Sequence, residues 1–530
     1  MGRKTKKTAK GQAPPTHSDK APLTQSDKAP PTQAEPAQGP EQGNVNTSAA
    51  VPELSKSARK EVAELITSLL EVCSKPPESG NKELEDYPEI NGLVEKIRNI
   101  QSVLALPSRN REDGFPTFLK WLNDNGVDTS ALEITQFPQY GYGLKGTRDL
   151  KESEKLLQIP RKLMMTVDSA KQSPLGALIK EDKILQVMPN VTLALHLLNE
   201  KLNPQSFWKP YIDILPSSYL NPLYWSSEDL QLLNGSPVKG DAINQYRNIA
   251  RQYAYFYRLL QKQPDSMTQL YVKQCFTFDN YRWAVSSVMT RQNQIPARDG
   301  SRATLGLIPL WDMCNHCNGI YTSDYNTEQD ACECFCLKDF EAGQQILMFY
   351  GPRSNGEFLV HNGFVYPDNE HDRLCLKLGI SKSDPLYTQK SDLLSKLSLA
   401  PQRAFYLHLG RFPVDGDLMA FLRVFCMDEG VLTEKFSGEV SAGQLEALKD
   451  EDSETNNQND EKVWTFLQTR ANLLLKTYPG SLEEDEAVAT RQDVPETQRM
   501  AAQLKVGERK ILLNTIDYAD KKKASLKSSE

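Results

Sequence analysis

Hydrophobic side chains recur along the chain at two different spacings, and the places where the spacing changes divide it into segments. Over residues 51–107 the spacing is helical, which predicts two N-terminal helices. The apolar positions that carry it are Val62, Leu65, Ile66, Leu69 and Leu70 in the first helix, and Leu93, Ile97 and Ile100 in the second.

Strand-like patterning dominates the middle of the chain, but a long helical stretch interrupts it. Short apolar segments with glycine turns, such as Gly141-Tyr142-Gly143, occupy residues 115–165. Residues 167–291 are patterned as helices, and strand patterning returns over residues 305–366. We therefore expect a β-rich domain at residues 108–375 that carries a helical insert at 167–291.

Helical spacing dominates again from residue 393 onward. One apolar stripe consists of Val463, Phe466, Leu467, Leu473, Leu474 and Tyr478. The pattern predicts an α+β fold: short strands interrupted by a helical insert, followed by an all-α C-terminal domain at residues 376–517. The last residues, 518–530, are expected to form a flexible tail.

Residues 1–50 differ from the rest because they are repetitive. An eight-residue unit at 13–20 recurs at 21–28, and in decayed form at 29–36. The unit is rich in proline and nearly lacks apolar side chains, so burial cannot offset the entropy of ordering it. We expect a disordered tail.

Composition narrows the class of protein. Of 530 residues, 39% are hydrophobic and 25% are charged, with a formal net charge of −7. This balance argues against nucleic acid as a partner, because nucleic-acid binding favours a basic face. No apolar run approaches the roughly 20 residues that span a bilayer. The nine cysteines are too irregular for a disulfide framework. We expect a cytoplasmic monomer, and the basic pairs Arg3-Lys4 and Lys6-Lys7 leave nuclear import open beside a merely solvated tail.

One arginine stands out on a helix that opens near Asp279. Tyr281, Ala284, Val288 and Arg291 share one face of this helix by their spacing. The first three suit a core, whereas Arg291 would need an anion there. Either Arg291 caps the helix end or reaches solvent, or it binds a carboxylate.

Two further segments end in polar residues after an apolar run. Ile308 to His316 contains Trp311-Asp312-Met313-Cys314-Asn315, and Gly343 to Gly351 ends in Tyr350. Polar residues at strand ends are common sites of function. Taken alone, each segment is more typical of a buried strand and a turn, with Tyr350 as a core side chain.

Two groups of cysteines raise zinc as an interpretation. They are Cys314-Asn315-His316-Cys317 and Cys332-Glu333-Cys334-Phe335-Cys336. Neither has the repeated Cys-x2-Cys spacing of structural zinc sites. Alternation places the second group on one face of a strand, where cysteine serves as a small apolar residue. We expect no metal.

Taken together, these segments resemble the signature blocks of SET-domain methyltransferases. The blocks are Gly141-Tyr142-Gly143, Asp312 to His316, and Gly343 to Gly351. Their order and the helical insert resemble the branch typified by the Rubisco large-subunit lysine methyltransferase, which has a helical C-terminal substrate-binding domain. Within that branch, residues 281–296 and 308–316 are most similar to the members that methylate a histidine of actin.

The resemblance covers residues 54 to about 513 and implies S-adenosylmethionine as cofactor and a protein substrate, actin. Matching cofactor-binding positions are Arg111, Tyr140, Gly141, Tyr142, Arg291, Asp312, Met313, Cys314, Asn315, His316, Asn362, Gly363 and Phe364. Matching positions in the target-peptide groove are Arg251, Asn293, Trp311, Met348, Tyr350 and Arg353. Of these, Tyr350 and Asn293 are the implied catalytic residues. In this view Arg291 binds the carboxylate of the cofactor, and Phe364 covers its adenine.

The acceptor side chain stays open at this level. A lysine amine must first lose a proton at a pKa of about 10.4, whereas an imidazole with a pKa of about 6.5 is mostly neutral at cytosolic pH. A histidine acceptor therefore needs a partner that fixes its tautomer, a role that Asn293 would fill. A lysine methyltransferase, or a binding module without catalysis, remains an alternative because a fold does not settle the substrate.

Overall fold

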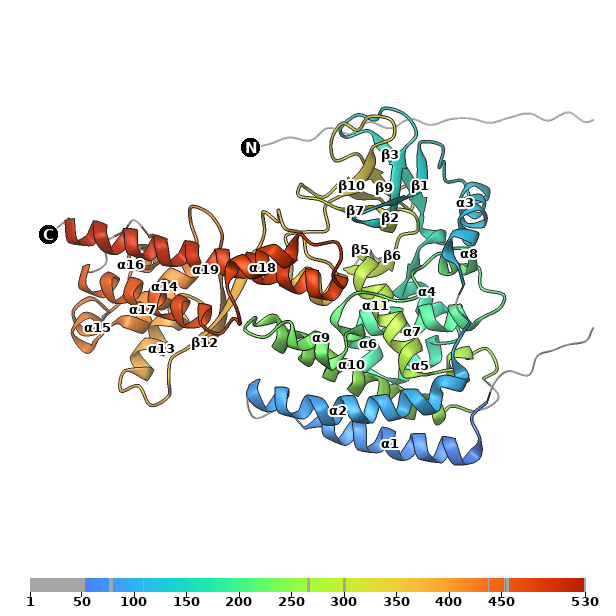
Figure 1. Cartoon of the computed structure of the whole chain (residues 1–530), viewed down its shortest axis with the longest axis horizontal. Helices are drawn as coiled ribbons and strands as arrows, with labels where there is room; N and C mark the ends of the chain where they lie inside the picture. Colours follow the sequence, from blue (N-terminus) through green and yellow to red (C-terminus); the bar gives the residue numbers. More distant parts are fainter. Residues whose placement is uncertain are drawn as a thin grey trace, which may run out of the picture. The chain divides into compact units, whose positions relative to one another are not determined.

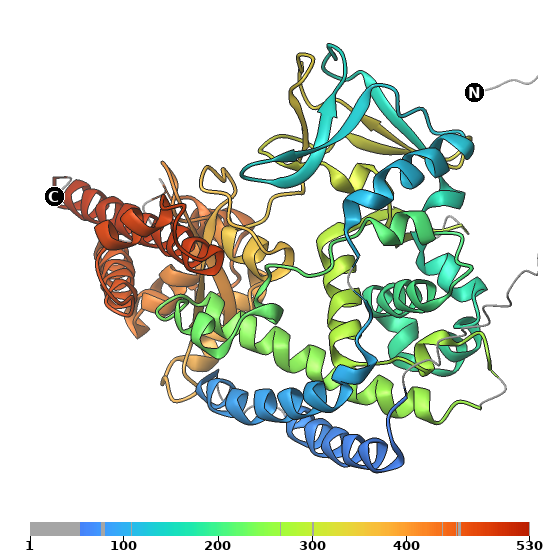
Figure 2. The same cartoon turned by 45° about the vertical axis from the view of Figure 1, so that its right-hand side comes forward.

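The structure is a computed structural model that describes residues 53–75, 80–107, 109–264, 267–298, 302–436, 438–451, 453 and 457–528. The predicted repeat tail at residues 1–50 lies outside these residues. The N-terminal helices are α1 (Lys56–Ser74), α2 (Gly80–Gln101) and α3 (Phe115–Asp124). Helices α1 and α2 pack along the long helix α10 (Val238–Gln261), as Figure 1 and Figure 2 show, and α1 buries Val62, Ile66 and Leu69 of the predicted stripe.

The strands of the β-rich domain form small sheets that join distant parts of the chain. One sheet has the order β1 (Leu132–Phe137), β2 (Gly141–Gly146), β10 (Gln345–Met348), β7 (Asn315–His316). Strand β10 is antiparallel to β2 and parallel to β7, where Met348 is opposite His316. The three predicted signature blocks therefore meet in this one sheet.

Two other sheets complete the domain. One contains β3 (Lys155–Pro160), β9 (Ala331–Phe335) and β8 (Ser323–Asn326). The other contains β4 (Met165–Thr166), β6 (Ala303–Leu307) and β5 (Gln292–Pro296). Both β4 and β5 pair with β6, so the two ends of the helical insert lie on either side of one strand.

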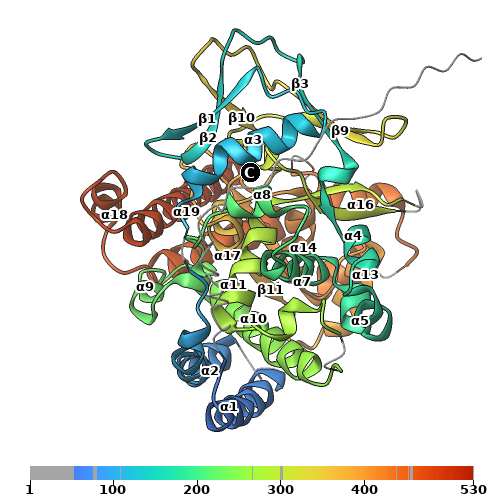
Figure 3. The same ribbon diagram turned by 90° about the vertical axis from the view of Figure 1, so that its right-hand side faces the viewer.

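The insert runs from Val167 to Arg291 and is helical. Its helices are α4 (Val167–Gln172), α5 (Gly176–Glu181), α6 (Lys183–Val187), α7 (Pro189–Leu202), α8 (Lys209–Asp213), α9 (Ser227–Gln231), α10 and α11 (Phe278–Arg291). Thr277 caps α11 by accepting from the N–H of Asn280. Helix α11 packs against α7 (Figure 3) and buries Tyr281, Ala284 and Val288 on the predicted face.

The α+β class is confirmed, but the C-terminal part of the fold differs from the prediction in two respects. Strands β11 (Arg373–Gly379) and β12 (Gln402–His408) pair there, so the domain is not purely helical. Its helices are α13 (Tyr387–Lys396), α14 (Gly416–Cys426), α15 (Glu429–Phe436), α16 (Ala442–Lys449), α17 (Asn457–Leu475), α18 (Leu482–Ala489) and α19 (Glu496–Ser528). The expected flexible tail at 518–530 is wrong up to Ser528, because α19 packs along α17 and buries Ala519.

The insert and the C-terminal domain meet at a close backbone contact. Gly235 has φ +90°, and a Cβ there would lie 2.6 Å from Tyr478 Cα and 2.8 Å from the Thr477 carbonyl oxygen. Beside it, the hydroxyls of Ser236 and Tyr478 donate to the buried Glu508 carboxyl at 2.8 and 3.0 Å. Burial raises the pKa of Glu508 to about 8. This contact connects the C-terminal domain to the insert.

Replacing Gly235 by alanine should weaken that contact. A left-handed conformation costs an L residue about 1–2 kcal/mol, before the clash with the Tyr478 backbone is added. We expect a lower Tm for Gly235→Ala by differential scanning calorimetry. The matched control is Gly92→Ala in α2, where an added Cβ meets nothing within 4 Å and helix propensity favours alanine. Equal melting temperatures for the two variants would contradict this account of the contact.

Candidate active site

Two cavities meet between the β-rich domain and the insert. The larger one has a volume of about 460 Å³, within the range of small-molecule sites. It is lined by every position predicted to bind cofactor: Arg111, Tyr140, Gly141, Tyr142, Arg291, Asp312, Met313, Cys314, Asn315, His316, Asn362, Gly363 and Phe364.

The smaller cavity has a volume of about 70 Å³. It contains five of the predicted groove residues: Asn293, Trp311, Met348, Tyr350 and Arg353. The two cavities share five of their lining side chains: Thr290, Arg291, Asp312, Tyr350 and Asn362. A molecule in the large cavity and a group in the small one would therefore meet at these residues.

The assignment of Arg251 to the target-peptide groove stays a prediction. Its side chain is exposed on α10 and donates to Asn248 Oδ1 at 3.0 Å, and it lines neither cavity. A third cavity, of about 460 Å³, shares Met289 and Gln292 with the small one. The neighbouring Gln252 lines this third cavity, and Arg251 lies about 100° further around the helix.

A buried ion pair lies where the first two cavities meet. Arg291 Nη1 donates to the Asp312 carbonyl oxygen at 2.7 Å and is 3.6 Å from its carboxylate. The hydroxyl of Tyr211 in α8 donates to the same carboxylate at 2.5 Å. Burial alone would lower the pKa of Arg291, but the adjacent Asp312 raises it above its usual range. Arg291 therefore neither caps its helix nor reaches solvent.

The chain turns sharply just before Asp312. Leu310 is fully buried and has φ +71°, a conformation that is rare for a residue with a side chain. After this turn, Trp311 lines the small cavity and Met313 the large one. Asp312, between them, lines both cavities. The strained turn thus distributes consecutive side chains between the two cavities.

Arg111 brings a second positive charge to the large cavity. Its Nε donates to the Ile214 carbonyl oxygen at 2.9 Å, and its guanidinium lies 5.0 Å from the centre of the Tyr142 ring. Burial, together with repulsion from Arg291, lowers the pKa of Arg111 to about 10. The guanidinium stays ionised at neutral pH and would gain from an anion.

Tyr350 is fixed at the boundary of the two cavities. Its hydroxyl donates to the Cys314 carbonyl oxygen at 2.6 Å, so the lone pairs of the oxygen remain available. Burial raises the pKa of Tyr350 above its usual range, and the phenol stays protonated. Its backbone N–H donates to His316 Nδ1 at 3.2 Å.

His316 is a buried, neutral side chain. Its ring packs among aromatic residues and lies 4.6 Å from the centre of Phe358. Burial lowers the pKa of His316 to about 4. Because Nδ1 accepts from Tyr350, the proton resides on Nε2, which has no partner in the described residues. His316 is thereby oriented by the chain itself.

Two glycines permit close approach at the large cavity. Gly363 has φ +80°, and a Cβ there would lie 2.6 Å from the Asn221 nitrogen. At Gly143, a Cβ would lie 2.7 Å from Asn315 Nδ2. Phe364, next to Gly363, stacks on Phe358 with ring centres 4.8 Å apart and also lines the cavity. Gly363 and Gly143 therefore allow their backbone segments to pack closely against neighbouring atoms.

In the small cavity, Asn293 presents one end of its amide. Its Nδ2 donates to the Arg291 carbonyl oxygen at 3.0 Å, which leaves Oδ1 as an acceptor. Asn293 stands opposite Gly306 in the pairing of β5 with β6. Trp311 is 2% exposed and forms another wall of the cavity.

Sequence reasoning missed several lining residues. Tyr219, Leu220, Glu496 and Arg499 line the large cavity, and Gln292 and Tyr321 line the small one. Glu496 and Arg499 belong to α19, which no motif connects to the site. Gln292 was adjacent to the predicted Asn293 and could have been included by its position in the strand.

Apart from the half-buried Cys317, the cysteines of both groups are buried. Cys332 and Cys334 have their sulfurs 3.9 Å apart on one face of β9, and Cys336 is buried beside them. Within the described ranges, no three His, Cys, Asp or Glu side chains are grouped to hold a metal ion.

No helix in the same ranges is long and apolar enough to cross a membrane.

Comparison with known proteins identifies two family domains and close relatives. The SET domain matches residues 141–351, and the Rubisco LSMT substrate-binding domain matches residues 381–512. The actin-histidine N-methyltransferase of Gallus gallus is 49% identical over 461 residues, which cover 87% of this chain and 78% of that protein. The Xenopus tropicalis protein of the same name is 48% identical over 473 residues, covering 89% and 81%.

Solved structures show the same fold. The SET domain of LSMT bound to lysine and AdoHcy superposes with a TM-score of 0.66 at 22% identity, covering 78% of this chain and 93% of that one. Rubisco LSMT bound to AdoMet superposes with a TM-score of 0.64, also at 22% identity and with the same coverage.

The imidazole of His316 should not titrate near neutral pH. Its pKa of about 4 lies below the ordinary value of 6.5. Between these values the unfolded chain binds a proton that the folded chain does not, so this side chain's contribution to stability is lost as pH falls from 6.5 toward 4. In NMR spectra of histidine-labelled protein, assigned with a His316→Asn variant, we expect one Nε2–H resonance that is constant from pH 5.5 to 8. A midpoint above pH 6 would contradict the described burial.

Proposed function

Because the chain belongs to the family of SET-domain actin-histidine N-methyltransferases, we propose that it transfers a methyl group from S-adenosylmethionine to a histidine of actin. The relatives that establish the family are about half identical over most of the chain. What supports the activity in this chain is the small cavity, in which Asn293, Trp311 and Tyr350 surround the place where an acceptor meets the large cavity.

The large cavity suits S-adenosylmethionine, a methyl donor with a carboxylate at one end and an adenine at the other. Buried polar atoms without a partner in the described residues cluster at this site: Arg291 Nε, Asp312 Oδ1 and His316 Nε2. Such atoms are costly unless a ligand or water satisfies them. Phe364, stacked on Phe358, offers a flat apolar surface for the adenine.

For the cofactor carboxylate we favour Arg111 over Arg291. Arg291 already has an anionic partner in Asp312. Arg111 uses only Nε within the described residues and keeps its terminal nitrogens for a ligand. An ion pair with a carboxylate would also offset the repulsion between the two arginines. Arg291 then acts by holding Asp312 and the shared wall in place.

The small cavity suits a flat imidazole better than a lysine chain. Its volume of about 70 Å³ leaves little room beside Trp311. Asn293 Oδ1 can accept the N–H of one imidazole nitrogen, which leaves the lone pair of the other nitrogen free to attack. A lysine offers no second polar atom, so the Asn293 acceptor would stay unpaired at a cost of about 1–3 kcal/mol.

The chain's contribution to the reaction is alignment. With the acceptor tautomer held by Asn293, the free nitrogen lone pair attacks the methyl carbon while the carbon–sulfur bond breaks. The Tyr350 oxygen, fixed by Cys314, presents lone pairs that can hold a polarised methyl group by C–H···O contacts. The methylated ring is cationic and keeps its N–H, which donates a hydrogen bond to Asn293 Oδ1. With a pKa of about 6.5 for an imidazolium, the ring then loses this proton to water. No strong base is required, because a neutral imidazole is already the nucleophile.

The third cavity offers space for the peptide on either side of the acceptor. Asn244, Gln245, Asn248 and Gln252 of α10 line it with carboxamides. Carboxamides donate and accept hydrogen bonds and so complement an extended peptide backbone. It adjoins the small cavity through Met289 and Gln292. We therefore assign this cavity to the residues that flank the target histidine.

Mass spectrometry of actin tests the proposed activity. After incubation with the protein and S-adenosylmethionine, we expect a methyl group on a histidine, and none on a lysine of histone treated in parallel. Tyr350→Phe should lower kcat about tenfold, equivalent to about 1.4 kcal/mol, with peptide binding largely kept because the ring remains. Methylation confined to lysine would refute the proposed acceptor. Wild-type turnover of Tyr350→Phe would leave Tyr350 only a packing role.

Acceptor choice can be tested at Asn293 and Trp311. Asn293→Phe removes the amide and places an apolar ring opposite Gly306, so we expect most activity on a histidine peptide to be lost. Adding Trp311→Ala opens space for a long chain, and the double variant should methylate the same peptide with lysine in place of histidine. The measurement is a competition between both peptides with labelled cofactor. An unchanged histidine-to-lysine preference in Asn293→Phe would show that Asn293 does not select the acceptor.

A further inference from the structure

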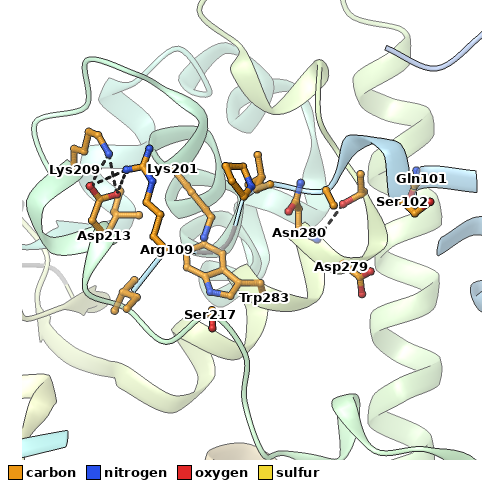
Figure 4. A pocket seen from close by; sticks show the side chains of 16 residues that line it. Gln101, Ser102, Arg109, Lys201, Lys209, Asp213, Ser217, Asp279, Asn280 and Trp283 are labelled. Atoms are coloured by element: carbon orange, nitrogen blue, oxygen red, sulfur yellow. Dashed lines mark hydrogen bonds and ion pairs between the residues drawn. The ribbon is translucent and has the colours of Figure 1, made fainter. Parts of the chain in front are cut away.

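A fourth cavity, separate from the active site, lies between the end of α2, helices α7 and α8, and the start of α11. Its volume is about 480 Å³. Figure 4 shows Lys201 and Trp283 near its middle, with Arg109, Lys209 and Asp213 toward one end and Gln101 and Ser102 at the other. None of these residues has a role in the methyl transfer described above.

Positive charge is in excess at the Asp213 end. Lys209 Nζ is 2.6 Å and Arg109 Nη1 is 3.3 Å from the Asp213 carboxylate, so one carboxylate serves two cations. Lys201 adds a third cation to this group. The other lining carboxylate, Asp279, is already paired with Arg98 at 2.9 Å and with Arg282. The described charges therefore leave two positive charges uncompensated.

Lys201 has no anionic partner of its own. Its ammonium lies 3.4 Å from the centre of the Trp283 ring, and no hydrogen bond or ion pair to it occurs within the described residues. Burial lowers the pKa of Lys201 to about 8, assisted by repulsion from Arg109 and Lys209 and opposed by Asp213. An ammonium in this position would be stabilised by an added anion.

One part of the cavity wall is apolar, whereas Gln101, Ser102, Ser217, Thr277 and Asn280 make other parts of it polar. Leu106, Pro107, Ile212 and Leu215 line it beside the Trp283 ring. A bare inorganic anion would leave these walls without a contact, whereas an organic group would cover them. Two uncompensated positive charges match a dianion better than a single carboxylate.

We propose that this cavity binds a small organic phosphate, with the phosphate group between Lys201 and Arg109 and the apolar part against Leu106, Ile212 and Leu215. A phosphate accepts the paired N–H groups of Arg109 and the three donors of Lys201. The hydroxyl of Ser217, which also lines the cavity, supplies a further donor.

The short segment of residues 215–219 separates the fourth cavity from the large cavity of the active site. Leu215 and Ser217 line the fourth cavity, whereas Pro216, Ser218 and Tyr219 line the large one. Trp283 Nε1 donates to the Pro216 carbonyl oxygen at 2.7 Å, and Arg111 Nε donates to the Ile214 carbonyl oxygen at 2.9 Å. A phosphate that orders this segment lowers the cost of ordering it around the cofactor. We therefore expect each ligand to tighten the other, and only this coupling rests on the proposed function.

Isothermal titration calorimetry with phenyl phosphate, without cofactor, tests the binding. We expect saturable binding that persists with excess S-adenosylhomocysteine, and at least several-fold weaker binding of inorganic phosphate and of phenylacetate. Lys201→Met should weaken phenyl phosphate about tenfold, and Asp213→Asn should strengthen it by removing the competing carboxylate. The matched control is Lys180→Met, an exposed lysine of α5 that lines none of the four cavities. If Lys201→Met fails to fold, Arg109→Gln serves in its place, with a several-fold loss expected.

The pH dependence separates Lys201 from the exposed cations. With a pKa of about 8, Lys201 is about nine-tenths protonated at pH 7 and about one-tenth at pH 9. If loss of the Lys201 charge weakens binding about tenfold, as expected for Lys201→Met, affinity for phenyl phosphate should fall about fivefold between these pH values. The fall should vanish in Lys201→Met. Absence of saturable binding, equal affinity in Lys201→Met and Lys180→Met, or equal binding of inorganic phosphate would overturn the proposed site. Binding without any change in S-adenosylmethionine affinity would overturn the coupling.

Discussion

The buried ion pair between Arg291 and Asp312 is the interaction on which the two active-site cavities depend. Arg291 ends the last helix of the insert, and Asp312 lies in the segment between β6 and β7. A buried charge that loses its partner costs about 3–5 kcal/mol, so neither segment can shift alone. Tyr211 adds a hydrogen bond from α8 to the same carboxylate. Three segments that are distant in the sequence are thereby held at one point.

The position of this pair explains why donor and acceptor would meet at one place. Both residues line the large and the small cavity, and Tyr350 lines both beside them. The wall between the cavities is therefore made of side chains already fixed by charge and hydrogen bonds. Methyl transfer needs alignment more than acid–base chemistry, and preorganised groups supply alignment without further cost when the substrates bind. The neutral His316 and protonated Tyr350 belong to the same fixed frame.

Much of the site could be predicted from the sequence because its residues cluster in short motifs around β2, β7 and β10. The insert could also be predicted, since helical spacing identified it directly. The role of Arg251 stays a prediction, because its exposed side chain lines neither active-site cavity but donates to Asn248, which lines the third cavity. The helical course of residues 518–528 depends on packing against α17, which composition does not show. Strand β11 shows the alternation typical of a strand at Leu374, Leu376 and Leu378. This pattern was present in the sequence but covered only a few residues.

The insert therefore has more than one structural role. Its last helix supplies Arg291 and leads into Asn293, and its earlier segment 213–220 forms a wall of the cofactor cavity. Part of that segment also lines the fourth cavity: Leu215 and Ser217 face the fourth cavity, whereas Pro216 and Ser218 face the large one. Because one segment lines both cavities, a ligand that orders it in one cavity would lower the cost of ordering it around a ligand in the other. An anion bound in the fourth cavity would therefore act first on the cofactor site, which lies on the other side of this segment.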